Sequence, residues 1–102
     1  MVNSKSKNIV ITGGARGIGR ATARYLLSQP LSHHVFLIDL DGAELEYAAT
    51  KHLSAYAPRV DYARANLRSP EEIRAAVAKA AVFFNGRIDV LVNNAGTVTC
   101  SI

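Results

Sequence analysis

The sequence has a single cysteine, three prolines and no tryptophan among its 102 residues. One thiol, Cys100, excludes a disulfide framework, and the sequence does not cluster the ligands that a metal site would need. No apolar run approaches the roughly 20 residues that cross a bilayer, and the opening lysines are not followed by the apolar stretch of a secretion signal. These absences predict no metal, no membrane partner and, by default, a cytoplasmic location.

Positive charge exceeds negative charge, with a formal net charge of +4. A nucleic-acid-binding face would gather Lys and Arg, with aromatic residues interleaved as stacking platforms. Here the basic residues are spread over every segment and mixed with Asp and Glu, so we expect solvated helix surfaces and no nucleic-acid partner. Since 49% of the residues are apolar and 20% are charged, the composition predicts one packed domain over residues 1–102.

Four short segments have the character of β-strands. Residues 8–12, 35–39 and 89–93 are apolar and rich in β-branched side chains, as in buried parallel strands. Residues 60–66 alternate only partly, which indicates a weaker strand near a sheet edge.

The segments between these strands have helical signals. Apolar residues from Ile18 to Leu26 recur at spacings of three and four, which predicts an amphipathic helix. Asp41 with Glu44 forms a capping box for a helix over about 42–55, and Ser69 is the N-cap of a third helix. Alternating strands and helices predict an α/β fold: a partial Rossmann-type, doubly wound parallel sheet with four strands in the order 3-2-1-4 and three helices.

A glycine-rich loop, TGGARGIG from Thr12 to Gly19, joins the first strand to the first helix. In that position it predicts a dinucleotide site, and the alternative is that its three glycines merely make a tight loop. Gly13 permits the turn, Gly17 lets the backbone approach a pyrophosphate, and Gly19 lets the helix pack close to the strands. The pyrophosphate would bind at the helix N-terminus.

Asp39 ends the second strand, about 20 residues beyond Gly19, where an acid can hydrogen-bond the adenosine ribose. A carboxylate there repels the 2′-phosphate of NADP, so the sequence favours NAD. Arg16 keeps NADP open as the alternative, because its guanidinium could reach that phosphate if Asp39 turned away.

Two motifs together resemble the short-chain dehydrogenase/reductase family. TGGARGIG matches the family pattern TGxxxGIG, and residues 86–96, GRIDVLVNNAG, resemble its fourth strand and the NNAG turn that follows. The resemblance extends from about residue 7 to residue 96. It implies that Asn66, where most members have Asp, and the backbone of Leu67 meet the adenine, and that Ile18 turns its amide toward the phosphates. Glycine loop, strand tip and resemblance together predict a cofactor site of Thr12, Gly13, Arg16, Gly17, Ile18, Gly19, Asp39, Asn66, Leu67, Asn94, Ala95 and Gly96.

The resemblance also implies an activity, NAD(P)-dependent hydride transfer between nicotinamide and a carbonyl or alcohol. The family performs it with a Ser and a Tyr-x-x-x-Lys pair located after NNAG, and this sequence ends at Ile102, six residues after Gly96. We therefore expect a cofactor-binding portion, truncated after the fourth strand and without catalytic residues. The alternative is a non-catalytic NAD(P)-binding module that acts through a partner.

Three further features need an interpretation. Tyr47 and Lys51 satisfy Tyr-x-x-x-Lys, but they precede NNAG on the helix after Asp39, so we interpret them as a helix-surface pair. His33 and His34, adjacent and without acidic or thiol neighbours, are expected to be solvated loop residues. Residues 90–92 of the fourth strand would form an exposed apolar edge and promote self-association.

Overall fold

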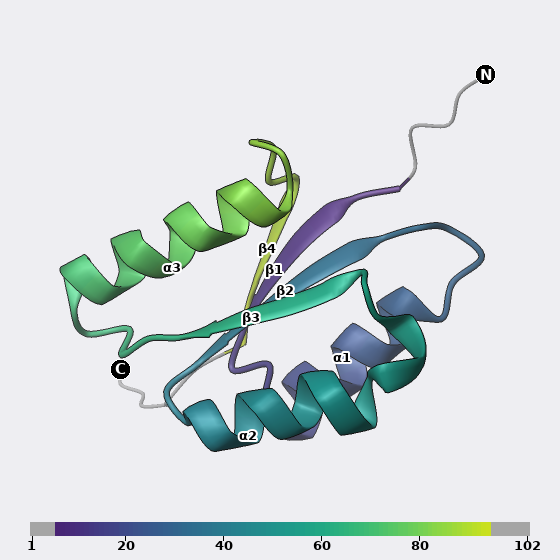
Figure 1. The fold of residues 1–102 in the computed structure, drawn as a ribbon, viewed down its shortest axis with the longest axis horizontal. Helices are drawn as coiled ribbons and strands as arrows, with labels where there is room; N and C mark the ends of the chain where they lie inside the picture. The colour runs from purple at the N-terminus through teal and green to yellow at the C-terminus, as the bar shows by residue number, and fades with distance from the viewer. Residues whose placement is uncertain (1–5, 95–102) are drawn as a thin grey trace, which may run out of the picture.

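A computed structural model describes residues 6–94 of the chain (Figure 1). Four strands alternate with three α-helices, as the sequence predicted. In chain order the elements are β1 (Asn8–Thr12), α1 (Gly17–Leu27), β2 (His34–Asp39), α2 (Gly42–Tyr47), a π-helical turn η1 (Ala48–His52), a 3-10 turn η2 (Ser54–Tyr56), β3 (Val60–Arg64), α3 (Pro70–Phe83) and β4 (Val90–Asn93). The strand bounds agree with the predicted ones to within two residues.

The strands form one parallel sheet in the order β3-β2-β1-β4, which confirms the predicted topology. In this register Val10 of β1 lies between Phe36 of β2 and Leu91 of β4. The chain runs outward from β1 to β2 and β3, then returns to place β4 on the other side of β1. Such a reversal leaves a crevice at the carboxyl ends of the strands, where open α/β sheets bind their ligands.

Helices cover both faces of the sheet. Helices α1 and α2 lie on one face and α3 lies on the other (Figure 1). Alternate residues of β1 point to opposite faces, so that Ile9 and Ile11 join the cluster under α1 and α2, while Val10 joins the cluster under α3. Phe36 of β2, fully buried, and Phe84 are the two largest buried side chains of the α3 cluster.

Two of the three helices begin at a side-chain cap that the sequence predicted. The Asp41 carboxylate accepts a hydrogen bond from the Glu44 amide at 3.1 Å, and the Ser69 hydroxyl accepts one from the Glu72 amide at 3.2 Å. Each cap satisfies an amide that has no partner within its own helix. Helix α1 has no side-chain cap and no acidic residue in its first turn.

The buried side of α1 differs from the apolar pattern in the sequence. Ile18 and Tyr25 are 76% and 64% exposed, whereas Gly19, Ala23 and Leu27 are buried against the sheet. Small residues on that side allow the helix to approach the strands closely, and this close packing decides which side is buried.

The predicted helix over 42–55 is interrupted after α2. The amide of Leu53 donates to the carbonyl of Ala48, five residues earlier, in the wide turn η1. A π-type turn takes up one extra residue, and it keeps Leu53 on the buried side together with Leu45, both fully buried. The correction therefore has a packing cause.

The expectation that His33 and His34 are solvated loop residues is wrong. His34 is the first residue of β2, and His33 is only 6% exposed. The Nδ1 atom of His33 accepts a hydrogen bond from the backbone amide of Lys7 at 2.9 Å, and its carbonyl accepts one from Arg59 at 2.7 Å. Burial, and then the positive charges of Arg59 and Lys7, lower the pKa of His33 below its ordinary value.

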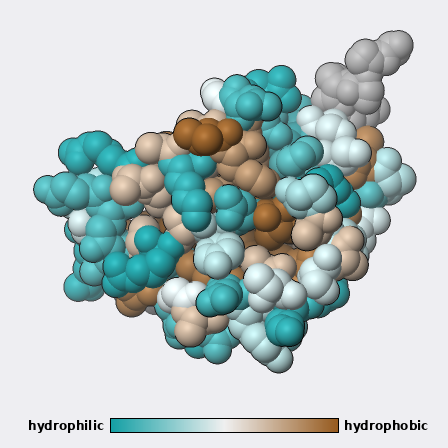
Figure 2. All heavy atoms as spheres, in the orientation of Figure 1, coloured by the Kyte–Doolittle hydropathy of each residue, from teal (hydrophilic) through white to brown (hydrophobic). Residues whose placement is uncertain are grey.

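The outer side of β4 has no strand partner among residues 6–94. Val90 and Leu91 of this edge are 38% and 63% exposed, which agrees with the exposed apolar edge that the sequence predicted. Elsewhere, the space-filling view shows apolar side chains reaching the surface among polar ones (Figure 2).

Candidate cofactor-binding site

The loop between β1 and α1 depends on two glycines with positive φ. Gly13 has φ +67° and Gly17 has φ +61°, a region that side-chain-bearing residues rarely adopt. A Cβ added at Gly17 would have no heavy atom within 4 Å, so this residue faces open space. The loop therefore exposes backbone, with no side chain in front of it, at the start of α1.

Gly19 and Gly14 are required for close packing. A Cβ on Gly19 would collide with the carbonyl of Gly13 and lie 2.7 Å from the Asn94 side-chain nitrogen. A Cβ on Gly14 would lie 2.7 Å from the Leu37 side chain, because the loop rests on β2. The sequence predicted a packing role for Gly19 but missed Gly14, whose only signal was its place beside Gly13.

The start of α1 combines free amides with an exposed cation. Arg16 occupies the N-cap position with an extended backbone, and its side chain caps nothing. Side chains cap one amide at the start of α2 and one at the start of α3, whereas no side chain caps the first amides of α1, which can therefore donate to an anion.

Asp39, at the tip of β2, faces the glycine loop. One carboxylate oxygen accepts from the amide of Ala15 at 3.1 Å, and the other accepts from the amide of Leu40 at 2.7 Å. The carboxylate therefore points toward the loop, whereas the NADP alternative requires Asp39 to turn away so that Arg16 can reach the 2′-phosphate. Asp39 is also partly exposed, and each carboxylate oxygen can accept further hydrogen bonds.

The end of β4 is tied to the glycine loop through two asparagines. The Thr12 hydroxyl donates to the Asn93 side-chain oxygen at 3.0 Å and accepts from the Asn94 amide at 3.0 Å. The Asn94 side chain donates to the carbonyl of Gly13 at 3.2 Å. Asn94, predicted as a residue of the cofactor site, thus lies against the glycine loop. Ala95 and Gly96 lie outside the described residues.

The turn after β3 holds the two residues predicted to meet the adenine. The Asn66 side-chain oxygen accepts from the amide of Arg68 at 2.9 Å, so it already closes a local turn. The amide of Leu67 has no acceptor among residues 6–94. Leu67 therefore presents a free backbone donor at this strand end.

These residues meet at one edge of the sheet. Thr12, Asp39 and Asn93 are the last residues of β1, β2 and β4, and Asn66 follows β3. Among residues 6–94, no group of three His, Cys, Asp or Glu side chains could hold a metal ion. Both residues of the Tyr-x-x-x-Lys match are exposed, Tyr47 on α2 and Lys51 on η1. The Tyr47 ring contacts the His52 ring, with the two centroids 4.9 Å apart.

Comparison with known proteins identifies the family of the chain. The family model for short chain dehydrogenases matches residues 7–101. The chain is 37% identical over 92 residues to the sex determination protein tasselseed-2 of Zea mays, covering 90% of this chain and 26% of that protein. It is 38% identical over 91 residues to 2-(R)-hydroxypropyl-CoM dehydrogenase of Xanthobacter autotrophicus, covering 89% and 35%.

A solved structure, L-sorbose reductase of Gluconobacter frateurii complexed with NADPH and L-sorbose, superposes with a TM-score of 0.80 at 32% identity, covering 95% of this chain and 36% of that one. The chain belongs to the short-chain dehydrogenase family. It spans about a third or less of the length of the relatives named here. Among residues 6–94, no helix has both the length and the apolar character needed to cross a membrane.

Proposed function

We propose that this chain is the nicotinamide-dinucleotide-binding part of an oxidoreductase. The observation that carries the proposal is the glycine loop, where Gly17 faces open space beside the uncapped start of α1 at the carboxyl edge of a parallel sheet. A diphosphate needs such a place, with backbone donors, a favourable helix dipole and no Cβ in front. L-sorbose reductase, which shares this fold, was solved with NADPH bound.

Each predicted residue has a role in this proposal. The backbone from Arg16 to Gly19, including the amide of Ile18, holds the pyrophosphate, and Gly13 supplies the turn that presents it. Asp39 accepts hydrogen bonds from the adenosine ribose. The free amide of Leu67 donates to the adenine ring, with Asn66 beside it. Thr12 and Asn94 line the cofactor at the ends of β1 and β4, and the proposal extends this role to Ala95 and Gly96, which follow Asn94 in the sequence.

We propose NAD as the preferred cofactor over NADP. The Asp39 carboxylate is held toward the loop by two amides, so its negative charge stays where a 2′-phosphate would bind. The cationic side chain of Arg16, at the N-cap of α1, opposes this preference without displacing Asp39.

The proposed activity of the whole protein is hydride transfer to or from a carbonyl or alcohol. The nicotinamide ring, when bound, supplies or accepts the hydride. In this proposal the present chain contributes cofactor binding and no catalytic side chain, acts in the cytoplasm, and pairs through the exposed β4 edge with another chain.

Calorimetric titration of the folded protein with NAD and with NADP tests the proposal. We expect saturable binding of both, with NAD the tighter. Absence of binding of either dinucleotide at millimolar concentration would overturn the assignment, and tighter binding of NADP would overturn the cofactor preference alone.

A further inference from the structure

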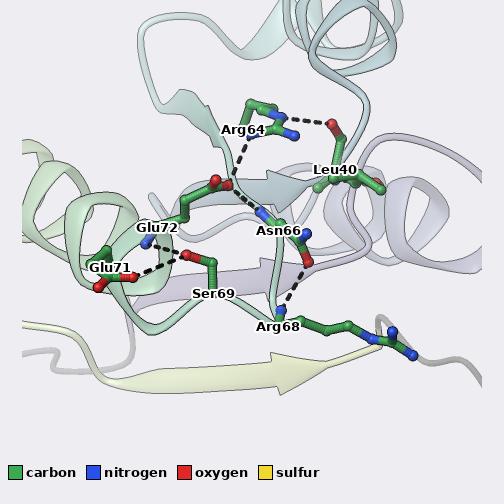
Figure 3. Close-up of polar contacts among 8 residues, drawn as sticks. Leu40, Arg64, Asn66, Arg68, Ser69, Glu71 and Glu72 are labelled. Atoms are coloured by element: carbon green, nitrogen blue, oxygen red, sulfur yellow. Dashed lines mark hydrogen bonds and ion pairs between the residues drawn. The ribbon is translucent and has the colours of Figure 1, made fainter.

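One carboxylate oxygen joins three segments around the turn after β3 (Figure 3). The Glu72 Oε1 atom, on the first turn of α3, accepts from the Asn66 amide at 2.8 Å and from Arg64 Nη1 at 2.9 Å. Arg64 in turn donates through Nε to the carbonyl of Leu40 at 3.1 Å. The tip of β2, the end of β3 and the start of α3 are therefore linked through Glu72.

Almost every backbone amide of the turn after β3 donates a hydrogen bond. The amide of Ala65 donates to the Asp39 carbonyl, that of Asn66 to Glu72, that of Arg68 to the Asn66 side chain, and that of Ser69 to the Asn66 carbonyl. Only the amide of Leu67 is left over within the described part of the chain. A turn with one remaining donor in a fixed direction is suited to recognise a single acceptor on a planar ligand.

We infer that Glu72 is a positioning residue for the adenine end of the cofactor. In this inference Glu72 does not contact the ligand and instead fixes the turn that recognises the adenine. The inference rests on the proposed function. Loss of the carboxylate would leave the Asn66 amide and the Arg64 guanidinium without their shared acceptor. The turn could then rotate the Leu67 amide away from its working direction.

The chemistry of purines provides a selective measurement. Adenine offers a ring-nitrogen acceptor at N1 and an amino donor beside it, whereas hypoxanthine offers an N1–H donor and a carbonyl acceptor. A turn that presents the Leu67 N–H to N1 therefore prefers NAD over its hypoxanthine analogue, nicotinamide hypoxanthine dinucleotide. A turn that has lost its fixed direction binds both more equally.

Glu71 provides a matched control, because it lies in the same first turn of α3. Both acids interact favourably with the helix dipole, but among residues 6–94 the Glu71 carboxylate accepts one hydrogen bond, from the Ser69 hydroxyl at 3.5 Å. Glu72→Ala and Glu71→Ala therefore remove equal charge from the same helix end. Glu72→Gln keeps an acceptor oxygen, and Glu72→Asp keeps the charge but shortens its reach.

The dissociation constants of both dinucleotides are measured for each variant of the intact protein. In the unmodified protein we expect at least about a tenfold preference for NAD, the discrimination that one well-placed hydrogen bond gives. Glu72→Ala should weaken NAD binding about tenfold and change binding of the analogue by less than about threefold. Glu72→Gln should recover most of the preference, and Glu71→Ala should keep it.

Three results would overturn the inference. One is a Glu72→Ala protein that retains the full preference, another is Glu71→Ala losing it equally, and the third is both dinucleotides weakening equally in Glu72→Ala. If circular dichroism shows that Glu72→Ala does not fold, Glu72→Asp decides instead: loss of the preference supports the inference and full retention contradicts it. Failure of the unmodified protein to bind NAD at all would instead reject the proposed function.

Discussion

Replacing Gly17 by alanine should both strain the backbone and block the proposed diphosphate site. At φ +61° a Cβ introduces strain of about 1–2 kcal/mol. Alanine also restricts the unfolded chain more than glycine does, which returns about 0.4–1 kcal/mol. Because no heavy atom lies within 4 Å of the added Cβ, there is no overpacking cost. The expected net loss is therefore about 1 kcal/mol in the free energy of unfolding.

Gly86 provides a matched control for that strain. It has φ +94°, and its added Cβ also meets nothing within 4 Å. The residue follows α3 and lies before β4, away from the carboxyl edge of the sheet. Gly86→Ala should therefore destabilise the fold at least as much as Gly17→Ala, while leaving the proposed cofactor site unchanged.

Thermal unfolding and calorimetric titration with NAD measure the two effects. Both variants should lose about 5 °C in Tm, the shift expected for about 1 kcal/mol in a domain of this size. Gly17→Ala should also weaken NAD binding by at least about tenfold, since the methyl group occupies space that the pyrophosphate needs. Gly86→Ala should bind NAD within about twofold of the unmodified protein. If Gly17→Ala binds NAD as tightly as Gly86→Ala does, the diphosphate is not held at this loop.

Three further predictions concern cofactor choice, pH and association. Asp39→Ser should improve the affinity for NADP relative to NAD by about tenfold, because the repelling carboxylate is gone; titration with both cofactors measures the ratio, and an unchanged ratio counts against the role of Asp39. The pKa of His33 is lower in the folded protein than in the unfolded chain, so the unfolded chain takes up a proton first as the pH falls. The free energy of unfolding should therefore be highest above about pH 6.5 and should decrease below that pH until the lower pKa of the folded protein is passed. Urea unfolding from pH 7.5 to 5 should show this slope reduced in His33→Gln but retained in His34→Gln, and equal slopes would reject the assignment. Leu91→Lys should reduce self-association of the 102-residue chain in analytical ultracentrifugation, whereas a monomeric unmodified chain would contradict pairing through β4.

Features fixed by neighbouring residues were predictable from the sequence. Ser69 and Asp41 cap their helices because a short polar side chain reaches an amide three residues ahead in any such helix. The alternation of strands with helices is also local, and it predicts a parallel sheet whose crossovers are right-handed. The glycine loop belongs to this class, since the positive φ values of Gly13 and Gly17 arise within the turn itself.

Features decided by distant contacts were not predictable in the same way. The spacing of Ile18 and Tyr25 is helical, but the sheet selects the side of Gly19 and Ala23 because small residues permit the closest approach. His33 is buried because Lys7 and Arg59, each 26 residues away along the chain, supply its hydrogen bonds. Neither fact leaves a periodic signal in the sequence.

The candidate site depends on the same kind of distant contact at each strand end. Asp39 at the end of β2 binds the amide of Ala15, and Asn94 after β4 binds the carbonyl of Gly13. Glu72 from α3 binds the amide of Asn66 after β3. Each side chain occupies a backbone group that would otherwise need water, and together these bonds hold the loops at the carboxyl edge of the sheet in place. In the described part of the chain, the amides at the start of α1 and at Leu67 have no such partner, and they lie where the diphosphate and the adenine of a dinucleotide are proposed to bind.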